Sequence, residues 1–164
     1  MLENLPLKLL ITFATVILME PLVALAHRHV MHGWGWNWHR DHHEAGHKNL
    51  ERNDLFALVG AGLSVLVFAI AGTADYWLFW VALGMTIYGV LYALLHDGLV
   101  HRRYPLGWTP KRGYLRRLVE AHHLHHAVRG KEGSVSFGFL YAPPVGRLRA
   151  ALREQTERAG GKSA

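Results

Sequence analysis

Thirteen histidines in a chain of 164 residues, with no cysteine at all, are the feature best able to support chemistry. The lack of cysteine excludes disulfides, an iron–sulfur cluster, a thiolate haem and a cysteine zinc finger. Within the histidines one pattern occurs twice. An HxxxxH pair is followed by an HxxHH group in residues 27–43, and again in residues 96–126. A duplicated pair of histidine boxes is a strong signal for a metal site built from imidazoles.

Helical geometry explains the HxxHH spacing. At about 100° per residue, positions i, i+3 and i+4 of an α-helix share an arc of roughly 100°, so three imidazoles can face one site. The HxxxxH pairs would lie about 140° apart on an ideal α-helix, so they need a bend or a frayed helix end. The candidate catalytic and metal-ligating residues are His27, His32, His39, His42, His43, His96, His101, His122, His125 and His126.

Ten imidazoles exceed the four to six or so ligands of one ion, so the pattern predicts two metals. Imidazole alone does not choose among iron, zinc, copper and nickel. Three carboxylates near the boxes could hold the second nitrogen of a ligand or bridge the metals: Asp41, Asp97 and Glu120. Outside the boxes, we expect His29, His47 and His123 at the surface or behind the ligands.

Apolar runs predict how the boxes are anchored. Residues 55–74 and 76–95 are two runs of 20 uncharged residues separated by Asp75, each long enough to cross about 30 Å of hydrocarbon. A third apolar run covers residues 5–26. A cleaved signal peptide is the alternative interpretation of that run. The run contains Glu20, which either supports a ligand or pairs with a cation.

The sequence therefore predicts an all-α integral membrane protein that forms a single domain over residues 1–164. It has three transmembrane helices, or four if the third extends, and a histidine-rich helical di-metal cap on one membrane face. Thirteen of the 18 Lys and Arg follow His96 and only Lys8 precedes His27, so that face is expected to be cytoplasmic. The net charge of +6 then reflects membrane orientation rather than nucleic-acid binding. Residues 145–164 are expected to form an amphipathic tail on the membrane surface.

The histidine segments resemble the signature of bacterial β-carotene 3-hydroxylases, in the fatty acid hydroxylase superfamily. The resemblance rests on HRHVMHGWGW at 27–36 and the histidines up to residue 43, and on HDGLVHR at 96–102 and the histidines of 122–126. It extends to SFGFLYAPP at 136–144, so it covers about residues 7–144. The family is often drawn with four membrane helices, one more than the three apolar runs found here.

The resemblance implies a membrane di-iron monooxygenase of carotenoid biosynthesis. Such an enzyme hydroxylates the 3 and 3′ carbons of β-ionone rings and converts β-carotene through β-cryptoxanthin to zeaxanthin. Its cofactor is a pair of iron ions and its co-substrate is dioxygen. It also implies a bacterial inner membrane location, in contact with the lipid bilayer. Phe137, Phe139 and Tyr141 are candidates to line the substrate slot.

The electrons must come from a separate donor, because the chain has no cysteine cluster and no GxGxxG motif for a dinucleotide. The resemblance suggests a ferredoxin with its reductase, so that NADPH acts only through that donor. The basic residues available to dock an acidic partner are Arg102, Arg103, Lys111, Arg112, Arg116 and Arg117. These charges could instead serve only membrane topology and lipid headgroups.

Other functions remain open at this point. A carotenoid ketolase, or a fatty acid or sterol hydroxylase, would share the metals and topology and differ in pocket shape. A histidine-rich metal transporter is disfavoured because residues 55–74 and 76–95 contain neither a charge nor a histidine. An assembly protein with structural zinc would hold a redox-inert metal. The oligomeric state is open as well.

Overall fold

Three long apolar helices lie side by side in the computed structural model, which describes residues 4–44, 50–104 and 106–160. Helix α1 (Leu5–Ala26) continues into the π-helix η1 (His27–Trp34), and α4 (Trp77–Tyr92) continues into the π-helix η2 (Ala93–Val100). The third is α3 (Asp54–Ala71).

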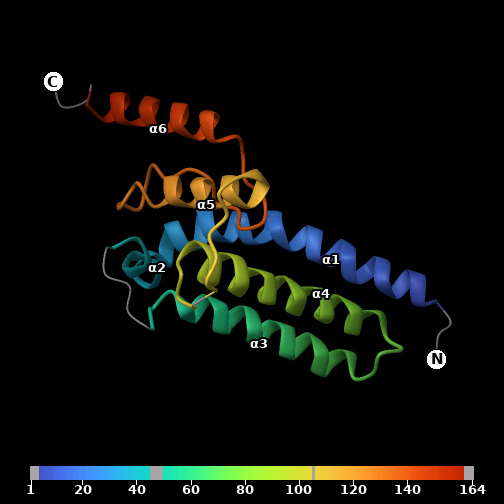
Figure 1. Ribbon diagram of the computed structural model, residues 1–164. Coiled ribbons are helices and arrows are strands. Elements are labelled where there is room, and N and C mark those ends of the chain that lie inside the picture. Colours follow the sequence, from blue (N-terminus) through green and yellow to red (C-terminus); the bar gives the residue numbers. More distant parts are fainter. Residues whose placement is uncertain (1–3, 45–49, 105, 161–164) are drawn as a thin grey trace.

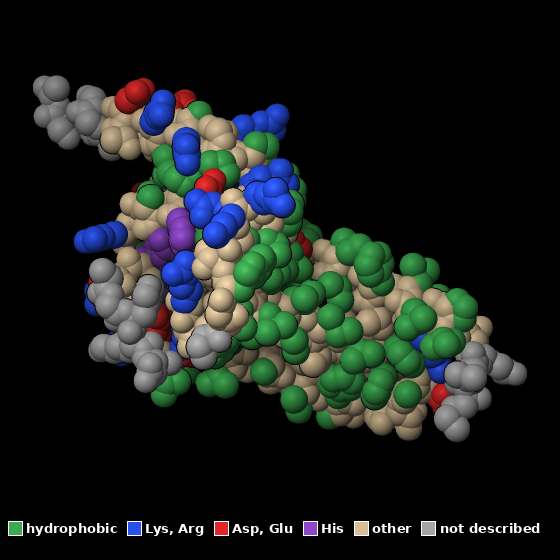
Figure 2. All heavy atoms as spheres, viewed as in Figure 1, with side chains coloured by type: hydrophobic (Ala, Val, Ile, Leu, Met, Phe, Trp, Pro, Cys, Tyr) green, Lys and Arg blue, Asp and Glu red, His purple; other side chains and the backbone are tan. Residues whose placement is uncertain are grey.

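These continuous helices have 30, 18 and 24 residues, which at about 1.5 Å per residue is roughly 45, 27 and 36 Å. Each is long and apolar enough to cross a membrane. Their outward side chains are apolar, as at Leu10, Phe13 and Val65, which are 60%, 64% and 67% exposed. Figure 2 shows this apolar surface over the long helices. Most of the Lys and Arg side chains in this view lie at the end of the molecule away from the N-terminus. The prediction of three spans is confirmed, and the described residues include no fourth.

Helix α4 lies between α1 and α3 and packs on both (Figure 1). At Gly84 a Cβ atom would lie 2.6 Å from the Cβ of Thr15 and 2.7 Å from the carbonyl oxygen of Thr12. Only glycine therefore allows α1 and α4 to approach this closely, as small residues do in many membrane helix pairs. The Thr12 hydroxyl also donates a hydrogen bond of 3.1 Å to the Trp80 carbonyl.

Three shorter helices gather at the end of the bundle away from the N-terminus: α2 (Trp36–His43), α5 (Gly113–His125) and α6 (Val145–Gly160). Every element in the described part of the chain is helical, as predicted. The expected amphipathic tail is α6. Its apolar residues Leu148, Ala151 and Leu152 pack on the core that α5 shares with η2, so this face covers protein.

Candidate metal centre

π-Helical backbone resolves the spacing problem of both HxxxxH pairs: the first pair lies inside η1, and the second runs from η2 to His101, the residue that caps it. In a π-helix the hydrogen bonds run from i to i+5, so residues five apart lie much closer to one face than they do in an α-helix. The first pair, His27 and His32, lies inside η1. In the second pair the N–H of His101 donates to the carbonyl of His96 at 2.9 Å, an i+5 bond. A kink at Gly33, with φ −106° and ψ −122°, then turns the chain from η1 towards α2.

Nine of the ten box histidines form two neighbouring groups, of five and of four, and the tenth, His96, adjoins the second. In the first group, the ring nitrogens of His27, His32, His39, His43 and His125 all lie within 4.8 Å of one another. In the second group, the same holds for His42, His101, His122 and His126, and His96 joins them because its Nε2 lies 3.2 Å from that of His42. The middle histidine of each HxxHH box crosses over: His42 joins the second half of the sequence, and His125 joins the first.

Backbone and side-chain oxygens orient most of these rings. Seven Nδ1 atoms lie 2.6–3.0 Å from an oxygen, which can only accept, so each of these Nδ1 atoms carries the proton. The partners in the first group are the carbonyls of Phe137, Lys131, Val128 and Val135 and the side-chain oxygen of Asn53. In each of these neutral rings Nε2 is therefore left with a lone pair aimed at the centre of its group.

The spacing of the Nε2 atoms fits bound cations. The Nε2 atom of His39 lies 3.0 Å from that of His27 and 3.2 Å from that of His43. With all three protons on Nδ1, these contacts oppose lone pairs and need a positive charge between them. Two nitrogens bound at about 2.1 Å and at right angles to each other would be about 3.0 Å apart. The donor set of each group therefore suits one metal ion.

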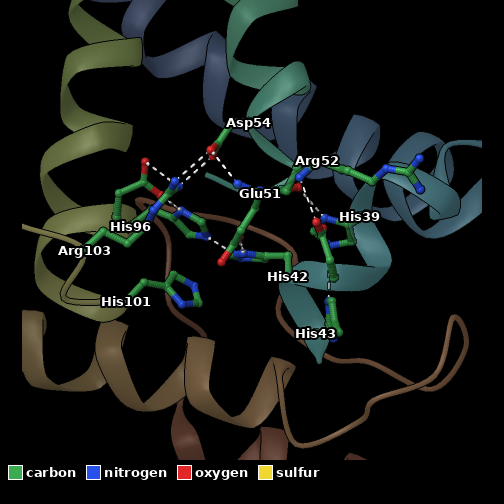
Figure 3. A network of polar contacts seen from close by, with 12 residues as sticks. His39, His42, His43, Glu51, Arg52, Asp54, His96, His101 and Arg103 are labelled. Carbon is green, nitrogen blue, oxygen red and sulfur yellow. Dashed lines mark hydrogen bonds and ion pairs between the residues drawn. The ribbon is translucent and has the colours of Figure 1, made fainter. Parts of the chain in front are cut away.

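The two groups differ in the charge behind their ligands. In the second group Nδ1 of His42 donates to Glu51 at 2.7 Å, and Nδ1 of His96 donates to Asp97 at 2.7 Å. Arg103 lies 3.7 Å from Asp97 and also binds both carboxylate oxygens of Asp54, at 2.6 and 2.7 Å (Figure 3). The first group has only neutral partners among the described contacts. An anionic partner makes an imidazole more basic, so the second group should hold a cation more strongly.

Burial keeps the rings neutral and able to bind metal. His39, His42 and His125 are at most 2% exposed. Loss of solvation lowers the pKa of His39 from about 6.5 to about 3 and that of His43 to about 4. Burial, and then the neighbouring imidazoles, hold the pKa of His122 and of His125 well below the ordinary value.

Comparison with known proteins gives the family. Residues 12–143 match the family model for fatty acid hydroxylases. A β-carotene hydroxylase from Pantoea ananas is 57% identical over 146 residues, which are 89% of this chain and 83% of that protein. The chain belongs to the fatty acid hydroxylase family, in the group of β-carotene hydroxylases. The resemblance based on the histidine segments is thereby confirmed.

Other members of this hydroxylase group support the same assignment. A β-carotene hydroxylase from Paracoccus sp. (strain PC1) is 50% identical, over 91% of this chain and 96% of that protein. The chloroplastic β-carotene 3-hydroxylase 1 of Arabidopsis thaliana is 36% identical, over 76% of this chain and 41% of that protein. No solved structure matches the chain.

Three carboxylates, Asp41, Asp97 and Glu120, were candidates to support a metal ligand. In the part of the chain that the structure describes, only Asp97 contacts a box histidine. Asp41 accepts the backbone N–H of Arg52 at 2.7 Å, and Glu120 pairs with Arg116 on the preceding turn of α5. Sequence reasoning missed Glu51 and Asn53, which hold His42 and His39. Their only sequence signal is a short polar stretch, residues 51–54, directly before an apolar span.

The remaining predicted side chains fall outside the two groups. His29 and His123 are exposed, and His47 lies outside the described residues. Among the basic residues, Arg103 is turned into the network of Asp54 and Asp97 rather than towards a partner, and its side chain is 11% exposed. Glu20, for which a histidine or a cation was expected, instead binds backbone N–H groups of residues 139–141 and the hydroxyl of Tyr88.

Proposed function

We propose that this membrane hydroxylase adds hydroxyl groups to the 3 and 3′ carbons of β-carotene, by way of β-cryptoxanthin to zeaxanthin, with two iron ions held by the ten box histidines. The observation that carries the proposal is the pair of adjacent histidine groups, of five and of four with His96 beside it, where membrane-length helices end. A lipid-soluble substrate can reach that place from the bilayer, while electrons and protons arrive from water. The names of the relatives supply the substrate class.

When bound, the irons supply the activation of dioxygen: one oxygen atom enters the C–H bond, and the other leaves as water with two electrons and two protons. Zinc would fit the same imidazoles but has no redox chemistry, so the reaction requires a redox-active metal, and iron is the one that the family resemblance implies. The chain itself orients the ligands through Nδ1 hydrogen bonds and buries them. The rings of Phe137 and Phe139 lie 5.1–5.5 Å from that of His27 and help to exclude water from its group.

The electron donor and membrane face are part of the proposal. Thirteen of the 18 Lys and Arg follow His96, which supports a cytoplasmic position for the metal centre in a bacterial inner membrane. A ferredoxin served by an NADPH-dependent reductase would supply the electrons. Arg102, Lys111, Arg112 and Arg116 are exposed at this end and suit an acidic partner.

The test is expression in cells that accumulate β-carotene, followed by chromatography with mass spectrometry of the pigments. We expect mono- and dihydroxylated products, and none from a His125→Ala variant that still inserts in the membrane. A keto product would place the protein among ketolases. No conversion by membrane-inserted, iron-loaded protein would refute the proposed substrate and direct attention to fatty acids or sterols.

A further inference from the structure

Glu20, in the apolar helix α1, is surrounded by hydrogen-bond donors. Its carboxylate accepts the backbone N–H groups of Phe139, Leu140 and Tyr141 at 3.0, 3.0 and 2.8 Å. The hydroxyl of Tyr88 on α4 donates a fourth bond of 2.8 Å. An ionised carboxylate only accepts hydrogen bonds, so four donors match it, and they offset the cost of a charge in an apolar helix.

The segment that supplies three of these donors, residues 136–142, is shaped closely around the carboxylate. At Gly138 a Cβ atom would collide with the Glu20 carboxylate and lie 3.1 Å from the carbonyl oxygen of Tyr141. Ser136 has a φ of 60°, in the left-handed region that favours glycine. We call residues 136–142 the aromatic segment, and Glu20 connects it to α1 across more than a hundred residues of sequence.

One side of the aromatic segment faces a hollow of about 370 Å³ against α1. Apart from Glu20 and the small Ser136 and Gly138, its lining is apolar: Pro21, Ala24, Phe137, Tyr141 and Pro143. Because α1 is part of a membrane-length helix, the hollow can be reached from the hydrocarbon of the bilayer. Its volume is near the lower end of ligand pockets, about 300–1,000 Å³, so it suits one end ring rather than a whole carotenoid.

The other side of the aromatic segment packs on the histidines. The ring of Phe137 lies 5.3 and 5.2 Å from those of His32 and His125, in the first group. The ring of Phe139 stacks on His27 at 5.1 Å and meets His96, in the second group, at 5.0 Å. Phe137 therefore borders both the hollow and the first group of histidines, so the hollow lies directly beside that group.

We propose that the hollow seats one end ring of the substrate, and that Glu20 is a positioning residue that fixes the aromatic segment as the wall of this seat. The proposal rests on the proposed function for the identity of the ring. Neighbouring ring carbons are only about 1.5 Å apart. Because a misplacement of about 1 Å can cost about a hundredfold in rate, a movable wall would expose other carbons to oxidation.

The first test compares Glu20→Gln with Glu154→Gln, an exposed carboxylate on α6. A glutamine amide has one oxygen and an NH₂ group, and the latter would face a backbone N–H as donor against donor. In detergent-purified Glu20→Gln we expect amide hydrogen exchange in residues 139–141 to be at least tenfold faster, with unchanged iron per chain. Its carotenoid products should include hydroxylation at ring positions next to C3, with a lower kcat/KM. Glu154→Gln should behave as the wild type.

The second test fills the hollow. Ala24→Trp should lower conversion at least tenfold and leave the iron content unchanged, whereas Leu22→Trp, at a position 60% exposed on the same helix, should not. Three results would overturn the proposal. For Glu20→Gln they are amide hydrogen exchange at the wild-type rate in residues 139–141, or loss of bound iron. For either Glu20→Gln or Ala24→Trp, the third is wild-type products formed at wild-type rates. If the wild-type protein is inactive on β-carotene, the proposed function is refuted. Hydrogen exchange can be measured without turnover, so it still decides whether Glu20 fixes the aromatic segment.

Discussion

Glu51→Gln separates the charge behind the second histidine group from its hydrogen bonding. The Glu51 carboxylate lies 2.7 Å from Nδ1 of His42, and the two side chains are 3% and 1% exposed. Glutamine has nearly the same size and still offers an oxygen to Nδ1–H, so the ring keeps its orientation. Only the negative charge is removed.

The magnitude follows from the hydrogen bond. A buried bond to a charged group contributes about 1.5–3 kcal/mol and a neutral one about 0.5–1.5 kcal/mol. The difference, about 1–1.5 kcal/mol, corresponds to a metal affinity that is weaker by up to about tenfold. That value lies at the lower end of the range of about 10–100-fold for partners of metal-bound histidines. The first group, whose His39 is held by the neutral Asn53, should not change.

The assay is a titration of metal-free protein in detergent with Fe²⁺ under anaerobic conditions, or with Co²⁺, against a competing chelator. We expect two binding constants in the wild type, of which Glu51→Gln lowers one by up to about tenfold. His125→Ala removes a ligand of the first group alone, so in that background Glu51→Gln should weaken the remaining site. Equal weakening of both sites, or of neither, would refute the assignment of Glu51 to one group.

Three further predictions concern the ligands, the pH dependence and the helix packing. His125→Ala should abolish hydroxylation and lower the iron content while the protein still inserts in the membrane, and exposed His123→Ala should do neither; full activity of His125→Ala would remove it from the ligand set. Because burial lowers the pKa of His39 to about 3 and of His43 to about 4, protons bind the unfolded chain preferentially below about pH 6.5. Stability should therefore fall by up to about 1.4 kcal/mol per pH unit and per histidine from pH 6.5 towards pH 4; a melting temperature of metal-free protein that stays flat from pH 7 to 5 would contradict this. Gly84→Ala should destabilise the α1–α4 packing by about 1–3 kcal/mol, seen as a lower melting temperature in detergent, whereas Gly89→Ala, where a Cβ meets nothing within 4 Å, should not.

Much of this molecule was predictable because the relevant signals are local. Unbroken apolar runs predict membrane-length helices wherever the chain folds, since backbone groups in hydrocarbon must bond within their own helix. The HxxHH spacing places three imidazoles on one helical face, so the candidate ligands could be named in advance. The three spans and the helical histidine cap appear in the structure where the sequence predicted them.

The π-helical turns could not be predicted from the spacing alone. An α-helix would have left His27 and His32 on different faces. The secondary-structure propensities of the residues do not indicate where an i+5 hydrogen bond will form. The structure adopts it in η1 and at the end of η2, and both histidines of each pair face the same group. Packing against the rest of the cap selects the rarer helix there.

Residue types and their spacing thus determined the helices, the three spans and the ten candidate ligands, because these depend on neighbours within a few residues. Tertiary structure decided how the ligands divide, because His42 and His125 each cross to the group of the other half of the chain. It also chose Glu51 and Asn53 as partners, and brought Glu20 to residues 139–141. Such contacts depend on how segments distant in the sequence pack together. The spacing of residues along one helix contains no information about that packing.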